Sequence, residues 1–345
     1  MDHLHPPWEQ AIKGTRPDQY FLFLRTFFYL QTKIHSTKVR TLQIMNFIQS
    51  EREENSPYLQ LLMLIFYAIL GLIVCLILAF IVLFAMYGTE LINNPAILVV
   101  PDLKFRPALQ ILLFAQSFGL FVVPPILLAI TEGKNVKVFY GLKRPGLKLT
   151  VIVFVIMIFS APLMEWAAVV NQKMELPHFL KGLEEWMRKS EDSLMETTML
   201  LLKMSTVWEL LLNIFLIALV AAVSEELMFR GALQRIFGRI FNNRHAAIWF
   251  SAFIFSAIHM QFYGFLPRFL LGAGFGYLYF WSGSLWYSIL AHFLNNAFAV
   301  CQAYYMQKHN LPLDTESTSY FAWYGYVISF TLTIIAFQLF NKQSK

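Results

Sequence analysis

The sequence predicts an all-α protein that crosses a membrane about eight times. Of its 345 residues, 57% are hydrophobic and only 14% are charged, a composition that soluble domains do not have. Eight apolar runs reach or approach the ~20 residues that a spanning helix requires. The formal net charge of +6 comes from Lys and Arg residues that lie mainly between these runs. Because basic residues in such loops set the orientation in the membrane, we predict no nucleic-acid partner.

The amino-terminal segment, residues 1–56, is mixed in composition and basic. Its longest apolar stretch, 20–30, is interrupted by Arg25 and is too short to span a bilayer. We therefore expect a cytoplasmic segment that lies on the membrane surface. Met45 stands just before the first clear span and offers an alternative start, in which case the first 44 residues are an extension.

The expected spans follow in order, with boundaries uncertain by a few residues. They cover residues 59–87, 108–130, 148–170, 207–228, 246–262, 267–281, 285–305 and 320–340. With a cytoplasmic amino end, the cytoplasmic loops and tail hold Lys134, Lys137, Lys143, Arg144, Lys148, Arg235, Arg239, Arg244, Lys342 and Lys345. Two opposite loops hold only Lys104, Arg106 and Lys308. This bias predicts a multi-pass protein of the cell membrane with both termini in the cytoplasm.

The loop at 172–205 does not follow the charge rule, because it has five basic residues among six acidic ones. Leu180, Leu183, Trp186 and Met187 are spaced to share one face of a helix. The pattern predicts an amphipathic helix at about 178–204 that lies on the far membrane surface.

Two further patterns have structural interpretations. Gly272 and Gly276 form GxxxG inside an apolar run, which favours a close contact between helices. The two cysteines, Cys75 and Cys301, lie in apolar runs, so neither a disulfide framework nor a CxxC metal site is indicated.

Ionisable and amide side chains gather between residues 224 and 296, within three very apolar stretches, SEELMFRG, FSAIHM and AHFLNNAF. They are Glu225, Glu226, Arg230, His259, His292 and Asn296. An ionisable side chain at membrane depth costs about 2.5–3.5 kcal/mol even on mild insertion scales. Several together therefore predict a functional site.

The spacing assigns different positions to the two glutamates. Neighbours on a helix point about 100° apart, so Glu225 and Glu226 cannot do the same job. Glu226 and Arg230 have the i,i+4 spacing and order of an intrahelical ion pair. Glu225 is then left to face a cavity.

The remaining polar residues supply complementary chemistry. His259 follows Phe255 by four residues, and His292 and Asn296 share a helix face. The rise per residue allows both histidines and Glu225 to meet at one depth. A carboxylate, two imidazoles and a carboxamide provide a base for water, a proton donor and donors to an oxyanion, which amide hydrolysis requires.

Other candidate residues carry weaker signals. Glu165 and Glu209 lie in or beside apolar runs and are interpreted as structural groups. Ser282 and Ser284 lie in a predicted turn, and only their proximity in sequence to His292 keeps a serine mechanism open. The sequence contains no HExxH motif, so a zinc protease of that pattern is not indicated.

Three motifs carry a resemblance to a known family: EExxxR (Glu225, Glu226, Arg230), FxxxH (Phe255, His259) and HxxxN (His292, Asn296). In this order they resemble the CPBP family of intramembrane proteases. That family includes the type II CAAX prenyl endopeptidases and the bacteriocin-processing and immunity proteins called Abi. EExxxR alone is not specific, whereas the three motifs together are.

The resemblance implies roles for these residues. Glu225 and His259 would activate the attacking water, His292 and Asn296 would stabilise the oxyanion, and Glu226 and Arg230 would support them. The family is often labelled metalloprotease, and Glu225, His259 and His292 could ligate zinc with one open position. We favour catalysis without a cofactor, because an asparagine is a poor zinc ligand and a good oxyanion donor.

The resulting domain organisation is a surface segment at 1–56, membrane helices at 57–204, a CPBP-type protease core at 205–305, and a final helix and tail at 306–345. We predict an endopeptidase that acts on a peptide or membrane-associated protein, with or without a lipid modification. Two alternatives are a non-catalytic immunity or scaffold protein that keeps the pocket, and a proton-coupled transporter. The transporter has less support because no inverted repeat or paired broken helices are visible.

Overall fold

The computed structural model describes residues 53–93, 103–311 and 321–345. The chain divides into two compact units, Met1–Glu54 and Asn55–Lys345, and the description below concerns the second. Throughout the described ranges the regular elements are helices and no strand occurs, which confirms the all-α prediction. Met45 and nearly all of the predicted 1–56 surface segment lie outside the described residues.

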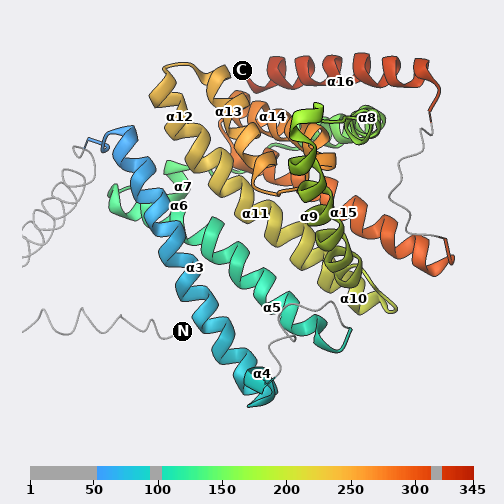
Figure 1. Cartoon of the computed structure of the whole chain (residues 1–345). Helices are drawn as coiled ribbons and strands as arrows, with labels where there is room; N and C mark the ends of the chain where they lie inside the picture. The colour runs from blue at the N-terminus through green and yellow to red at the C-terminus, as the bar shows by residue number, and fades with distance from the viewer. Residues whose placement is uncertain (1–52, 94–102, 312–320) are drawn as a thin grey trace, which may run out of the picture. The chain divides into compact units, whose positions relative to one another are not determined.

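Figure 1 shows the arrangement of the helices, which follow one another in the order below. The first half contains α3 (Pro57–Tyr87), α4 (Glu90–Asn93), η2 (Leu103–Phe105), α5 (Arg106–Ser117), η3 (Phe118–Val122), α6 (Val123–Thr131), α7 (Val136–Phe139), α8 (Leu147–Gln172), η4 (His178–Leu180) and α9 (Lys181–Leu201). The second half contains α10 (Val207–Asn213), η5 (Ile214–Val220), α11 (Ala221–Glu226), η6 (Leu227–Leu233), α12 (Gln234–Phe241), α13 (Arg244–Ala257), η7 (Phe262–Gly264), α14 (Phe265–Ser282), α15 (Leu285–Lys308) and α16 (Trp323–Ser344).

Five helical segments among the described residues are long and apolar enough to cross a membrane. They are Pro57–Tyr87, Leu103–Thr131, Leu147–Gln172, Val207–Phe241 and Trp323–Ser344. The chain is therefore a multi-pass membrane protein with five candidate spans. The other three predicted spans are helical as well, but α13 has only 14 residues and α14 and α15 carry more polar side chains.

The fourth candidate span is longer than predicted. It continues from Val207 through η6 and α12 to Phe241, whereas the sequence pattern ended it at 228. Arg235 and Arg239 therefore lie on a helix rather than in a loop. Arg239 donates to Gln60 Oε1 at 2.7 Å, and Arg235 packs 4.0 Å over the Phe139 ring. Two π-helical turns, η5 and η6, interrupt the regular α-helix.

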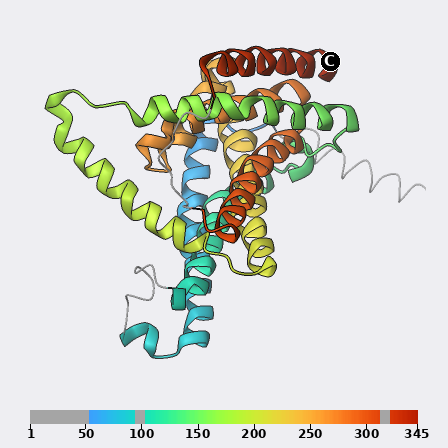
Figure 2. The same cartoon turned by 90° about the vertical axis from the view of Figure 1, so that its right-hand side faces the viewer.

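The candidate spans do not all run in one direction. α3, α5 and the α10–α12 segment lie side by side, while α16 runs across them (Figure 1). Figure 2 shows the same crosswise course for α8, which packs against α16.

Near its contact with α16, helix α8 contains Pro162, which has no N–H to donate. Ser329 of α16 inserts its hydroxyl into the adjoining backbone bond, donating to Phe159 O at 2.6 Å and accepting from Leu163 N at 3.1 Å. The two helices are thus joined where the backbone ladder of α8 opens.

The GxxxG pattern forms the predicted close helix contact. A Cβ at Gly272 would meet Phe255 of α13 at 3.1 Å, and one at Gly276 would meet Gln234 Oε1 at 2.7 Å. Side chains of α12 and α13 pack closely against α14 because these positions carry no side chain.

A helix is present at the predicted amphipathic segment, where α9 connects the region after α8 to α10 (Figure 2). Its place on a membrane surface stays a prediction. Glu191 and Glu184 of this helix accept from Tyr263 N and Tyr263 Oη at 3.1 and 3.3 Å, and Arg188 lies 4.3 Å over the Tyr263 ring. This contact joins α9 to η7.

Candidate active site

A cavity of about 260 Å³ opens among α11, α13, η7, α14 and α15. It is lined by Glu225, Phe255, His259, Gly264, Pro267, Arg268, Leu271, Phe275, His292, Asn295 and Asn296. The four predicted catalytic residues, which come from three separate segments of the chain, therefore share one cavity.

Glu225 and Glu226 face different surroundings, as their neighbouring positions on α11 require. The Glu225 side chain is 14% exposed, and its Oε2 lies 3.8 Å from His292 Nε2. The Glu226 side chain is fully buried and lies outside the cavity lining. Glu225 is thus the carboxylate available to a bound molecule.

Glu226 and Arg230 form the predicted ion pair, with 2.7 Å between Glu226 Oε1 and Arg230 Nη1. The same Oε1 lies 2.8 Å from His292 Nδ1 on α15. Arg230 also donates from Nη2 to Gly272 O on α14 at 2.9 Å. The pair therefore connects three helices and fixes the position of His292, a contact that sequence spacing did not predict.

The His292 ring is held in place by Glu226 and by the Phe275 ring. Because a carboxylate can only accept, Nδ1–H donates to Glu226 and Nε2 is left facing Glu225. The Phe275 ring stacks on the imidazole with 5.3 Å between centroids and 20° between planes. A carboxylate behind a histidine selects the tautomer and orientation of the ring.

His259 lies just past the end of α13, which stops at Ala257, and not within a helix as predicted. The chain turns here through Met260, which has a φ of 53°. Nδ1 of His259 lies 2.7 Å from Phe255 O, and since a carbonyl only accepts, Nδ1 carries the proton. Nε2 of the neutral ring then has a free lone pair, as a base requires.

Phe255 explains the spacing of the FxxxH motif. Its ring lies 5.1 Å from the His259 ring and 5.8 Å from the His292 ring, between centroids. Its other neighbour is the Arg230 guanidinium, 4.5 Å from the ring centroid. One buried ring thus packs against the Arg230 guanidinium and against both histidines.

Asn296 is held by two amide contacts. Its Nδ2 donates to Ile217 O at 3.2 Å, and its Oδ1 accepts from Asn295 Nδ2 at 3.2 Å. Ile217 lies in the π-helical turn η5, where the altered bonding pattern leaves a carbonyl available to a neighbouring helix. The second N–H of Asn296 Nδ2 remains for a ligand.

Sequence reasoning did not single out Arg268 or Asn295, which also line the cavity. Arg268 donates from Nη2 to Gln261 Oε1 at 2.6 Å. Arg268 could have been recognised from its position in an apolar run, FLPRFLL, because a basic residue within such a run is unusual.

Residues set aside in the sequence analysis have partners elsewhere. Ser284 Oγ donates to Lys143 O at 2.8 Å and Ser282 Oγ to Leu278 O at 2.7 Å, and neither serine lines the cavity. Glu209 pairs with Arg106 and caps α10, and Glu165 accepts from Tyr326 Oη at 3.0 Å.

The alternative metal site was tested against the placement of its donors. No three His, Cys, Asp or Glu side chains within the described ranges are grouped closely enough to hold a metal ion. The set Glu225, His259 and His292 does not fit a three-ligand centre in this arrangement, and we derive no step through a metal.

Comparison with known proteins agrees with this geometry. Residues 207–298 match the family described as "Type II CAAX prenyl endopeptidase Rce1-like". These residues are a domain of that family. The match contains all three motifs and confirms the resemblance drawn from them. The family that this segment matches is named for prenyl endopeptidases.

A curated relative matches part of the chain. A protein of Bacillus subtilis (strain 168) named "Uncharacterized protein YpbD" is 30% identical over 94 residues. The match covers 26% of this chain and 45% of the relative's length. No solved structure matches the chain.

Proposed function

We propose that this protein is an intramembrane endopeptidase that hydrolyses a peptide bond with water activated by Glu225 and His259. The observation that carries the proposal is the convergence of Glu225, His259, His292 and Asn296 on one cavity of about 260 Å³. The cavity thus contains a carboxylate, an imidazole with a free lone pair, and two side chains that can donate to an oxyanion.

In the proposed first step, a water molecule held between Glu225 and His259 Nε2 attacks the carbonyl carbon of the substrate. Its proton passes to the Glu225 carboxylate, and the carbonyl oxygen becomes an oxyanion. When the carbon–nitrogen bond breaks, Glu225 returns the proton to the leaving amine. General base catalysis of this kind contributes about 10²–10⁴-fold to the rate.

His292 and Asn296 are proposed to stabilise the oxyanion. Asn296 donates from the N–H of Nδ2 that does not bind Ile217 O, and His292 donates from Nε2 when that atom carries a proton. Glu226 supports this role by binding Nδ1 and holding the ring in place. Preorganised donors are worth about 10²–10³-fold each in comparable sites.

We propose that the chain crosses the membrane several times, with the site inside the bundle near the cytoplasmic face and both termini in the cytoplasm. Support comes from basic segments that meet at one end of the described unit. Arg239 binds Gln60 at the start of α3, Arg235 packs over Phe139, and Lys143 O accepts from Ser284 Oγ. Glu225 is 14 residues from Arg239 along the helix, or about 20 Å.

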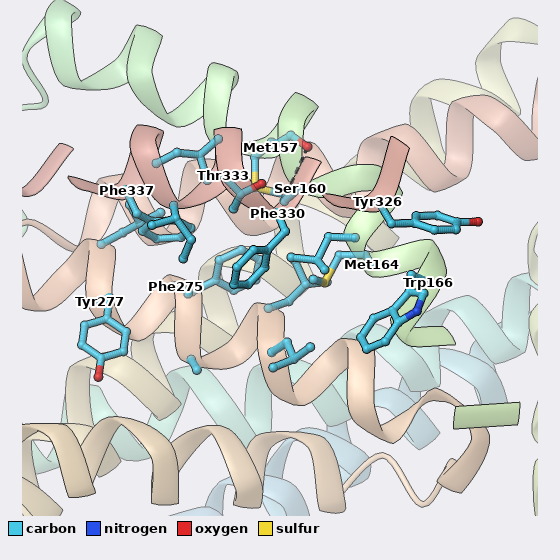
Figure 3. Close-up of a pocket in the computed structure, with 18 of the residues that line it drawn as sticks. Met157, Ser160, Met164, Trp166, Phe275, Tyr277, Tyr326, Phe330, Thr333 and Phe337 are labelled. Carbon is cyan, nitrogen blue, oxygen red and sulfur yellow. Dashed lines mark hydrogen bonds between the residues drawn. The ribbon is translucent and has the colours of Figure 1, made fainter. Parts of the chain in front are cut away.

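A second cavity is the reason to propose a lipid-modified substrate. It has a volume of about 960 Å³ and lies among α8, α13, α14 and α16. Most of the side chains labelled in Figure 3 are aromatic rings or methionines. Leu271 and Phe275 line both cavities, so a hydrocarbon chain in the larger one would lie beside a peptide in the smaller one.

Enlarging Val327 at the exposed rim to Trp should raise KM for a lipidated peptide and leave KM for the unmodified peptide unchanged.

The function is tested by comparing membranes from cells that carry the wild type or Glu225→Ala, using terminal-peptide proteomics. We expect at least one cleavage product to disappear in the variant. Glu165→Ala is the matched control, because it removes a carboxylate from α8 that does not line the catalytic cavity. Loss of the product in both variants would point to misfolding.

Retention of every product in Glu225→Ala would refute the proposal. If Glu225→Ala keeps the biological effect of the protein without cleavage, the pocket serves binding alone, as in an immunity or scaffold protein. Proton-coupled flux in liposomes would instead indicate a transporter.

A further inference from the structure

The cavity contains a cation that the proposed mechanism does not use. Arg268 lies in the first turn of α14, and its side chain lines the cavity together with Glu225 and His259. Nη2 donates to Gln261 Oε1 at 2.6 Å. Nη1 is buried and has no hydrogen-bond partner.

The Arg268 guanidinium also makes no direct ion pair with a described residue. No carboxylate in the described part of the chain lies within 4.0 Å of its guanidinium, although Glu225 lines the same cavity. A buried charge is costly unless an opposite charge and hydrogen bonds satisfy it. The nearby guanidinium of Arg230 illustrates the satisfied case, since it binds both a carboxylate and a backbone carbonyl.

Resting on the proposed function, we propose that Arg268 binds a carboxylate of the substrate within the catalytic cavity. A guanidinium donates parallel N–H groups that match the two oxygens of a carboxylate, and its charge complements an anion. The oxyanion of the reaction exists only transiently, whereas a substrate carboxylate satisfies Nη1 throughout binding. The anionic group is either the carboxyl end of the substrate or an Asp or Glu side chain.

This assignment limits where the substrate is cut. Arg268 and Glu225 line one cavity of about 260 Å³, so the carboxylate lies close to the bond that is hydrolysed. The contribution is to affinity and register, and Arg268 takes no proton in the reaction.

The experiment measures peptide binding by calorimetry in detergent. All proteins carry Glu225→Gln, so that the peptides are not hydrolysed. The probes are acetyl-Leu-Leu-Leu with a free carboxyl end, the same peptide with a carboxamide end, and acetyl-Leu-Glu-Leu-amide. We expect a carboxylate-bearing probe to bind about 10- to 100-fold more tightly than the neutral peptide, as expected for a charged hydrogen bond. The two charged probes distinguish a terminal from a side-chain carboxylate.

The variants separate binding from folding. Arg268→Met should abolish the preference for a carboxylate, and Arg268→Lys should keep part of it. Gly264→Ala is a milder second change, because the new Cβ would meet Arg268 Nη2 at 2.8 Å and displace the flexible end of that side chain. It should weaken binding of the charged probe more than binding of the neutral probe, even if Arg268→Met fails to fold.

Equal affinity for charged and neutral probes, or a preference that persists in Arg268→Met, would overturn the proposal. Such a result leaves the endopeptidase proposal intact, because that proposal depends on the products lost in Glu225→Ala. Conversely, suppose that the binding assay shows a carboxylate preference while the proteomic comparison finds no product that depends on Glu225. That result would support a binding pocket and refute the endopeptidase proposal.

Discussion

Replacing Glu226 by Gln should both destabilise the protein and stop cleavage, for two reasons that can be separated. The change keeps the size of the side chain and removes its charge. Glu226 Oε1 lies 2.7 Å from Arg230 Nη1 and 2.8 Å from His292 Nδ1, and both side chains of the ion pair are at most 1% exposed. The substitution therefore leaves a buried guanidinium without its counter-ion and a histidine without its carboxylate.

The expected cost follows from this burial. Breaking a buried ion pair by removing one partner costs about 3–5 kcal/mol. The lost hydrogen bond to His292 does not add fully, because both partners share one oxygen. We expect a loss of about 3–5 kcal/mol in an unfolding titration in mixed detergent micelles. Glu209→Gln is the control, with an expected loss of about 1–2 kcal/mol, because its ion pair is partly exposed.

A double variant, Glu226→Gln with Arg230→Met, distinguishes the two effects. An apolar replacement removes the uncompensated charge and should restore about 2–4 kcal/mol of stability. Cleavage should not return, because His292 still lacks the carboxylate on Nδ1. If the double variant cleaves substrate as well as the wild type, Glu226 acts only through Arg230 and the assigned role in orienting His292 is wrong.

Three further predictions concern other parts of the chain. Ser329→Ala should lower the stability of the α8–α16 contact by about 1 kcal/mol, measured in the same titration; no change would mean that Leu163 N and Phe159 O do not depend on Ser329. Prolonged chelation should leave cleavage unchanged and metal analysis of the pure protein should find no stoichiometric ion, whereas loss and recovery with added metal would contradict the donor placement. Arg188 and then Leu176 N hold the pKa of Glu184 below its usual 4.5, so the α9–η7 contact should persist above pH 4.5 and weaken as the pH falls below it. Limited proteolysis of α9 across this range measures the release, and release already at neutral pH would contradict the assignment.

Much of the site could be predicted because local spacing and composition determine it. Glu226 and Arg230 are one helical turn apart, so their ion pair required no knowledge of the fold. Glu225 faces the cavity because its neighbour cannot share that direction. The length of the fourth span could not be predicted, because the helix continues past 228 to Phe241. In that part of the helix Arg235 and Arg239 contact Phe139 and Gln60, which are distant in the sequence.

The sequence by itself determined the helical membrane class, the family resemblance and the set of six polar residues. These follow from hydrophobic runs and from i,i+4 spacings within single helices, which are local properties. Only the tertiary structure decided that Glu226 also binds His292, that His259 lies beyond its helix, and that Arg268 enters the same cavity with an unsatisfied Nη1. These contacts join segments up to 66 residues apart, and the packing of whole helices, rather than the order of residues within one, brings them together.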